Sequence, residues 1–408
     1  MTNSDNSSFY PVVRVINSLL MMTIAMSGMY ASIMVLEPAT REFDIGRGAG
    51  ALPFTMYMIG FGLGNIMLGG FMDRFGFARL SLAGAMFLPA GLYLASISSQ
   101  LWTFTFSLAV FCGFLGGGFC FGPLVADISH WFEKRRGLAV GIVISGSYVA
   151  GAIWPPVLQG WIDDQGWRDA FADLALICLL TMIPLSLVYL KKRDENTDEE
   201  PESVAHRWEQ PLGLGKRRLQ GLLCLAGIGC CAAMAMPQIH IVPHVTDLGF
   251  RPIDGAYMLG LMMGFGVISR VSSGWLSDRI GGLKTLILGS GLQAMVIAVF
   301  LVVDTLTGLY VASIAFGLAQ GGIVPAYTII IRRHFRPEEA GRRIGLAFVA
   351  TTGGMALGGW MAGILYDLSG SYTLSFLNAI AFNILNLGIA GYLLLQHQRI
   401  ATPATEPA

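Results

Sequence analysis

Two short stretches decide the fold of this chain: GGFMDRFGFAR at residues 69–79 and SGWLSDRIGGLK at residues 273–284. Positions of the first half recur about 205 residues later: Gly69, Asp73, Arg74, Gly76, Phe132 and Gly166 correspond to Gly274, Asp278, Arg279, Gly281, Phe335 and Gly370. The same loop chemistry therefore occurs twice in the same order. This pattern predicts two similar halves in the same orientation, a parallel repeat.

The composition around these stretches is that of a membrane protein. Hydrophobic residues make up 54% of the 408 residues and charged residues only 13%, whereas soluble proteins carry about 25% charged residues. So few charges cannot cover a surface in water, but a surface facing lipid needs none. The formal net charge of zero gives no support to a nucleic-acid partner.

A helix that crosses a bilayer needs about 20 mostly apolar residues. Lipid offers the backbone no hydrogen-bond partners, so we expect helices rather than open strands. Segments that meet this length occur at 15–37, 50–71, 79–98, 101–125, 137–158, 169–190, 219–242, 254–276, 283–303, 307–331, 343–366 and 372–395. The sequence predicts an all-α membrane protein with twelve transmembrane helices in two six-helix bundles.

Basic residues set the expected orientation. With both termini inside, 21 of the 26 lysines and arginines fall in inner segments and four in outer segments. Cytoplasmic loops carry this excess of positive charge. We therefore expect a multi-pass protein of the cytoplasmic (inner) membrane with both termini in the cytoplasm.

One long polar segment divides the chain. KKRDENTDEEPES begins at residue 191, and we interpret residues 191–218 as a cytoplasmic linker. The expected domains are an N-terminal six-helix bundle at 1–190 and a C-terminal six-helix bundle at 219–408. A parallel repeat of this kind predicts a central cavity between two bundles that rock about a site.

The repeated G-x-x-x-D-R-x-G pattern identifies the chain as similar to the major facilitator superfamily of transporters. More narrowly, HWFEKRRGLAVGI at 130–142, IHIVPHVTDLGF at 239–250 and GVISRVSSGWLSDRIG at 266–281 resemble the monocarboxylate and oxalate/formate transporter branch. The resemblance covers nearly the whole chain and implies a secondary carrier of small carboxylates.

The charged residues of the two repeated loops are candidates for gating. Asp73 and Arg74 in the first loop, and Asp278 and Arg279 in the second, can form contacts that break when the bundles rock. The alternative is a tight charged turn without a gating role.

Arg270 is the main candidate for binding substrate. It lies inside LMMGFGVISRVSSGW at 261–275, and a charge in hydrocarbon costs about 2.5–3.5 kcal/mol on insertion scales. Glycines, not acids, lie one turn away at Gly266 and Gly274. We expect Arg270 to face a cavity and hold a carboxylate bidentately, as the resembled branch implies. The alternative is a structural arginine bonded within the protein.

Two features limit the substrate and the coupling. The segment at 343–366 has no internal cation of the kind that holds a second carboxylate in some resembled carriers. Gly266 stands where some monocarboxylate carriers have an aspartate. The first feature favours one carboxylate over two. The second argues against classical proton symport, and both proton symport and anion exchange stay open as the coupling.

Aromatic residues and a histidine inside the expected helices could complete the site. A tyrosine can seal a cavity and orient an anion through its hydroxyl, and the histidine could carry a proton. These candidates are Tyr30, Tyr148, Tyr327, Phe119 and His240. For each of them the alternative is simple packing between helices.

The expected function is therefore secondary transport of a small organic anion, with H⁺ or a counter-anion as the coupling partner. We expect no catalytic residues, cofactor or metal, because the spans hold no clustered nucleophile, base or metal ligands and the six cysteines lie in apolar runs. We expect a monomer. The alternatives are a carrier of a neutral or cationic solute, such as a drug or sugar exporter, and a receptor that does not transport.

Overall fold

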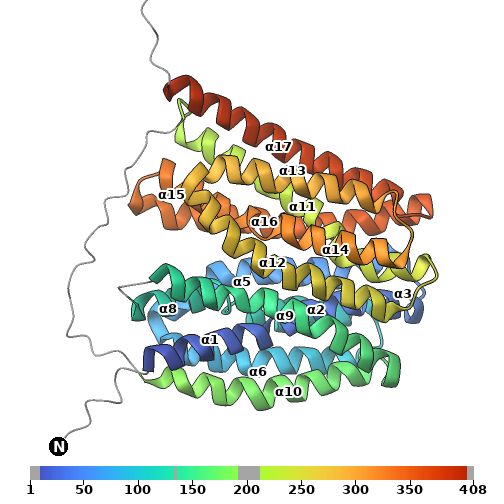
Figure 1. Ribbon diagram of the computed structural model, residues 1–408. Coiled ribbons are helices and arrows are strands. Elements are labelled where there is room, and N and C mark those ends of the chain that lie inside the picture. Colours follow the sequence, from blue (N-terminus) through green and yellow to red (C-terminus); the bar gives the residue numbers. More distant parts are fainter. Residues whose placement is uncertain (1–9, 133–135, 192–211, 402–408) are drawn as a thin grey trace, which may run out of the picture. The chain divides into compact units, whose positions relative to one another are not determined.

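The computed structural model describes residues 10–132, 136–191 and 212–401, except for a few side chains, that of Asp73 among them. This part of the chain is built from helices (Figure 1). In the described part of the chain, twelve helical spans are long and apolar enough to cross a membrane. The twelve predicted spans and the all-α class are thus confirmed. The predicted linker lies mostly outside the described residues.

The described chain divides into two compact units. Among the described residues, the first contains 10–132, 136–191 and 251–263, and the second contains 212–250 and 264–401. The dividing line crosses one helix, α12 (Pro252–Ile280). The division into bundles at 1–190 and 219–408 stays a prediction.

Six spans of the first unit come from its N-terminal part. Their elements are α1 (Tyr10–Ala25), α2 (Ser27–Met34), α3 (Leu36–Glu42), α4 (Arg47–Gly50), α5 (Leu52–Phe75), α6 (Phe77–Ser96), α7 (Leu101–Phe106), the π-helix η1 (Ser107–Gly117), α8 (Gly122–Trp131), α9 (Arg136–Gln165), α10 (Trp167–Leu187) and the 3₁₀ turn η2 (Val188–Leu190). Within this unit α6 packs against α10 and η1, and α1 packs against α9.

The second unit contains the rest of α12 and five further spans. Their elements are α11 (Lys216–Asp247), α13 (Gly282–Phe300), α14 (Leu306–Gln320), α15 (Ile323–His334), α16 (Pro337–Ser369) and α17 (Thr373–Ala401). Here α11 packs against α16 and α17, and α13 packs against α14 and α17.

The backbone repeats where the sequence repeats. Gly76 and Gly281 both adopt positive φ, at 81° and 85°, and each precedes a helix. Gly166 and Gly370 form a second pair, at 87° and 71°. A third pair was not predicted: Asp44 at 51° and Gly249 at 87° are again 205 residues apart. Side chains other than glycine rarely tolerate this region. Gly76 and Gly281 also share their ψ angle, at 156° and 158°, so these two loops turn in the same way.

Several predicted helices are interrupted, and one of them contains a π-helix. The span expected over 101–125 begins as α7, continues as the π-helix η1 and restarts as α8 with Pro123 in its first turn. Three glycines, Gly116–Gly118, end the π-helix. Glycine lowers helix stability, and proline at the first turn needs no partner for a missing N–H. The hydrophobic length was predicted correctly, but the break was not.

Candidate functional site

Arg270 lies inside the α12 span, ten residues before its end at Ile280, and is partly buried. Its Nε donates a hydrogen bond of 3.5 Å to the backbone carbonyl of Gly321, at the break between α14 and α15. The structure therefore attaches one edge of the guanidinium to the backbone of a neighbouring helix.

Glycines bring the neighbouring helix close enough for this contact. A Cβ on Gly321 would lie 2.2 Å from the carbonyl oxygen of Gly266 and 2.8 Å from the Cβ of Ser269. A Cβ on Gly322 would lie 1.9 Å from the hydroxyl oxygen of Ser273. Only residues without a side chain fit at such a crossing. The Gly321–Gly322 pair therefore sets the position of Arg270.

Two candidate tyrosines belong to the first unit. Tyr30 is buried on α2, and its hydroxyl donates to the carbonyl of Ser147 on α9 at 3.2 Å. Tyr148, the next residue on α9, is partly exposed. A Cβ on Gly151 would lie 2.3 Å from the Tyr30 hydroxyl. Tyr30 is thus fixed in a notch of α9, with Tyr148 beside its hydrogen-bond acceptor.

Phe119 is buried by its own unit. A Cβ on Gly84 of α6 would lie 2.1 Å from the Phe119 ring, and the ring centroid of Phe77 is 6.2 Å away. The side chain thus fills a gap in α6, which favours the packing alternative for this residue.

Tyr327 takes part in a buried hydrogen-bonded chain. Its hydroxyl donates to the side-chain carbonyl of Asn386 at 2.8 Å, and the Asn386 amide donates to the hydroxyl of Ser290 at 2.7 Å. This chain ties α15, α17 and α13 together. The hydroxyl proton of Tyr327 is used inside the bundle, which favours the packing alternative for this residue.

His240 is fully buried on α11 and contacts protein on both sides of its ring. Its Nε2 lies 2.8 Å from the carbonyl of Gly359, and its Nδ1 lies 3.0 Å from the hydroxyl of Tyr372. A carbonyl only accepts, so Nε2 donates to it, and a neutral ring then accepts the Tyr372 proton at Nδ1. These bonds connect α11 with α16 and with the start of α17.

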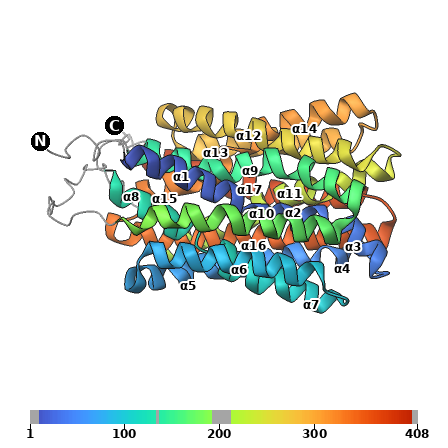
Figure 2. The ribbon, with the colours of Figure 1, turned by 90° about the horizontal axis from the view of Figure 1, so that it is seen from below.

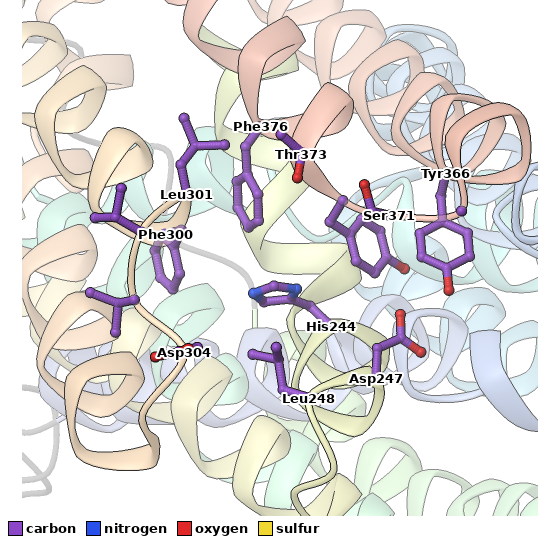
Figure 3. A pocket seen from close by; sticks show the side chains of 14 residues that line it. His244, Asp247, Leu248, Phe300, Leu301, Asp304, Tyr366, Ser371, Thr373 and Phe376 are labelled. Carbon is purple, nitrogen blue, oxygen red and sulfur yellow. The ribbon is translucent and has the colours of Figure 1, made fainter.

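One turn further along α11, His244 lines a pocket of about 510 Å³ in the second unit (Figure 3). The imidazole lies in the middle of the pocket, with Phe300 on one side and Tyr366 on the other. Its ring meets those of Tyr372 and Phe376 edge to face, at 5.5 and 5.2 Å. The aromatic side chains close this end of the helices.

The proposed gating residues lie at corresponding turns. Arg279 stacks over the Trp275 ring at 3.7 Å, and Arg74 lies 5.3 Å from the centroid of Phe75. Asp278 is exposed. The side chain of Asp73 lies outside the described residues.

The sequence analysis missed a buried ion pair between α1 and α8. Arg14 contacts Asp127 through two hydrogen bonds of 2.9 and 2.7 Å, and the two side chains are only 3% and 9% exposed. Both views show α8 and the start of α1 at the same end of the first unit (Figure 1, Figure 2). Asp127, an aspartate close to the end of an apolar span, was the signal in the sequence that could have indicated this pair. Its partner is 113 residues away, so the sequence did not show which residue it meets.

Buried amides in the second unit were also missed. The Gln238 side chain donates to that of Gln320 at 2.5 Å. Gln293 and Asn383 are fully buried, and within the described part of the chain their amide atoms have no hydrogen-bond partner. These amides make the interior of this unit more polar than its composition suggests.

Comparison with known proteins identifies the family. The sequence pattern of the Major Facilitator Superfamily matches residues 18–308 and 274–407. The chain belongs to the major facilitator superfamily. Among its relatives, monocarboxylate transporter 13 of Rattus norvegicus is 28% identical over 76% of this chain and 71% of its own length. The riboflavin transporter MCH5 of Saccharomyces cerevisiae is 24% identical over 75% of this chain and 62% of its own length.

Solved structures show the same superfamily fold. A bacterial homologue of the human lysosomal transporter Spinster, in an inward-facing and unoccupied conformation, matches with a TM-score of 0.75 over 99% of this chain and 100% of its own. Its sequence is 13% identical. A peptide transporter in complex with sulfate matches with a TM-score of 0.70 over 94% of this chain and 95% of its own, also at 13% identity.

These matches confirm the resemblance to the superfamily that was drawn from the two repeated loops. They also confirm the narrower resemblance to the monocarboxylate transporters. They identify a multi-pass membrane transporter rather than an enzyme. A small-molecule substrate follows from the same relatives. The roles of individual residues stay predictions.

Proposed function

We propose that this protein is a secondary carrier that moves a small monocarboxylate-like anion across the cytoplasmic membrane by alternating access. The observation behind the proposal is the place of Arg270, a cation inside an apolar span and held at a close helix crossing. Ionisable residues at this depth mark transport pathways. A guanidinium matches a carboxylate in both charge and geometry. The monocarboxylate transporter relatives point to the same class of substrate.

In this proposal Arg270 binds the carboxylate, and Tyr30 and Tyr148 stay candidates for substrate binding on the ground of the sequence. Tyr327, Phe119 and His240 support the helices, because each is occupied by contacts within its own unit. The two loops with Arg74 and Arg279 act in gating. We propose a monomer with both termini in the cytoplasm.

Uptake by proteoliposomes tests the binding residue. The purified chain and its Arg270→Gln variant are compared for uptake of labelled lactate, pyruvate, formate and oxalate. We expect the parent to transport a monocarboxylate and the variant to lose at least 90% of that flux. Arg251→Gln is the matched control, because Arg251 lies just before the same helix with a side chain 78% exposed. Undiminished carboxylate uptake by Arg270→Gln would remove Arg270 from the site.

Uptake by the same vesicles identifies the coupling partner. An imposed pH gradient that drives uptake indicates proton symport, whereas uptake that requires the anion inside the vesicle indicates exchange. Flux with neither gradient nor internal anion would contradict both forms of the proposal.

A carrier of a neutral or cationic solute is the alternative, and one relative is a riboflavin transporter. Labelled riboflavin in the uptake panel separates the two. Riboflavin flux that does not change in Arg270→Gln, without carboxylate flux, would favour this alternative. Carboxylate binding in detergent without any flux would indicate a receptor.

A further inference from the structure

The first unit holds a cavity of about 840 Å³ among α1, α8, the end of α5, the start of α6 and the turn η2. Arg74, Arg79 and Lys191 line it, and the buried Arg14–Asp127 pair forms part of its wall. Among the described lining residues, four permanent cations therefore face one carboxylate, and that carboxylate is already neutralised by Arg14. The cavity has an excess of positive charge.

The backbone adds to this charge. α6 begins at Phe77, directly after Gly76, and no side chain caps it. Gly76, Phe77 and Ala78 also line the cavity. The first-turn N–H groups of a helix carry partial positive charge and need acceptors from outside the helix. Together with the basic side chains, they favour a ligand that carries phosphate oxygens.

A second basic cavity occurs at the corresponding loop of the second unit. It measures about 410 Å³ and is lined by Arg279, Lys284 and Arg333, with Asp278 as its carboxylate among the described residues. Arg279 and Lys284 lie 205 residues after Arg74 and Arg79. The helix that follows, α13, also begins without a side-chain cap. Each half of the chain therefore carries a positive cavity in the same place.

The surroundings of the first cavity indicate what kind of phosphate fits. Phe75 and Leu190 line the cavity and are large apolar side chains exposed to 44% and 63%, and Phe71, one turn before Phe75 on α5, is exposed to 53%. On membrane-spanning helices such side chains face lipid tails. The cation Lys191 lies 4.5 Å over the ring of Tyr10, at the same end. Aromatic rings and basic side chains together are typical of the headgroup level of a bilayer.

We propose that the cavity lined by Arg79 and Lys191 binds the phosphate of an anionic phospholipid, with the acyl chains lying along the exposed faces of α5 and η2. The charge selects an anionic head group over a zwitterionic one. The adjoining apolar side chains select a lipid over free phosphate. The orientation expected from basic residues places this end at the cytoplasmic leaflet, where anionic lipids attract such clusters.

The test is lipid-dependent thermal stability of the full-length protein in detergent. Four additions are compared: phosphatidylglycerol, phosphatidylcholine with the same acyl chains, glycerol phosphate and inorganic phosphate. We expect phosphatidylglycerol to raise the melting temperature and to remain bound in native mass spectra, and the other three to do neither. An equal shift from phosphatidylcholine would overturn the selection by charge. An equal shift from inorganic phosphate would overturn the lipid as ligand.

Variants locate the site. Arg79→Gln and Lys191→Gln should each weaken phosphatidylglycerol binding about fivefold, as expected for one cation near an anionic head group. Arg41→Gln is the control, because Arg41 is an exposed arginine on α3 that does not line this cavity. Each variant is first compared with the parent without lipid, so that a folding defect is recognised. Unchanged phosphatidylglycerol binding in both single variants and in their combination would overturn the proposal.

Discussion

The close crossing at Gly322 gives the sharpest prediction about the site. A Cβ at this position would lie 1.9 Å from the hydroxyl oxygen and 2.1 Å from the Cβ of Ser273. Carbon atoms in contact sit about 3.5–4.0 Å apart. The Ser273 Cβ is fixed to the backbone of α12 and cannot rotate away. In Gly322→Ala the two helices must therefore separate by roughly 1.5 Å.

This separation should affect stability and substrate binding together. Overpacking of this kind costs about 1–3 kcal/mol, which should lower the melting temperature. It should also move Arg270, whose Nε bonds the carbonyl of the adjacent Gly321 at 3.5 Å. Misplacement of a positioning group by about 1 Å can cost as much as 100-fold in rate. We expect uptake of the carboxylate substrate to fall by tenfold or more, mainly through a higher KM.

A rescue and a control make the prediction specific. Ser273→Gly removes both clashing atoms, so the double variant should recover most of the stability and the uptake. Gly291→Ala on α13 is the control, because a Cβ there would meet nothing within 4 Å. That change should be neutral or stabilise by up to about 1 kcal/mol, since alanine favours a helix over glycine. If Gly322→Ala behaves like Gly291→Ala, or if Ser273→Gly gives no rescue, the reasoning about this crossing is wrong.

Three further predictions concern buried contacts. Asp127→Ala leaves Arg14 charged and buried and should cost about 3–5 kcal/mol, whereas Asp127→Leu combined with Arg14→Met should recover most of this loss in thermal unfolding. Tyr327→Phe leaves the carbonyl of Asn386 buried without its donor and should lower stability by about 1–3 kcal/mol. The KM for the carboxylate should not change. A KM raised tenfold at normal stability would show that Tyr327 contacts the substrate. His240→Leu should lower the melting temperature, because the His240 ring bonds protein groups on both sides. For the same reason uptake should depend on pH as it does in the parent. A loss of that dependence would show a role in proton transfer.

The sequence alone determined the membrane class, the twelve spans and the repeat. Lipid leaves a spanning backbone no alternative to internal hydrogen bonds, so apolar length translates directly into helices. The repeat was readable because Gly76 and Gly281 turn the chain where few other residues can. Arg270 also stood out in the sequence, since a charge inside an apolar span is rare.

Only the tertiary structure decided which polar side chains bond to other groups of the protein. The carboxylate that pairs with Arg14 and the carbonyl that accepts from His240 lie more than 100 residues away. Uniformly apolar helices carry little periodicity to show which face meets which neighbour. Helix packing also decided the crossing of Gly322 with Ser273 and the hydrogen bond of Tyr327 to Asn386, which the sequence could not tell from a substrate contact. Partners of this kind are chosen by helix packing, which depends on the whole bundle rather than on local residue pattern.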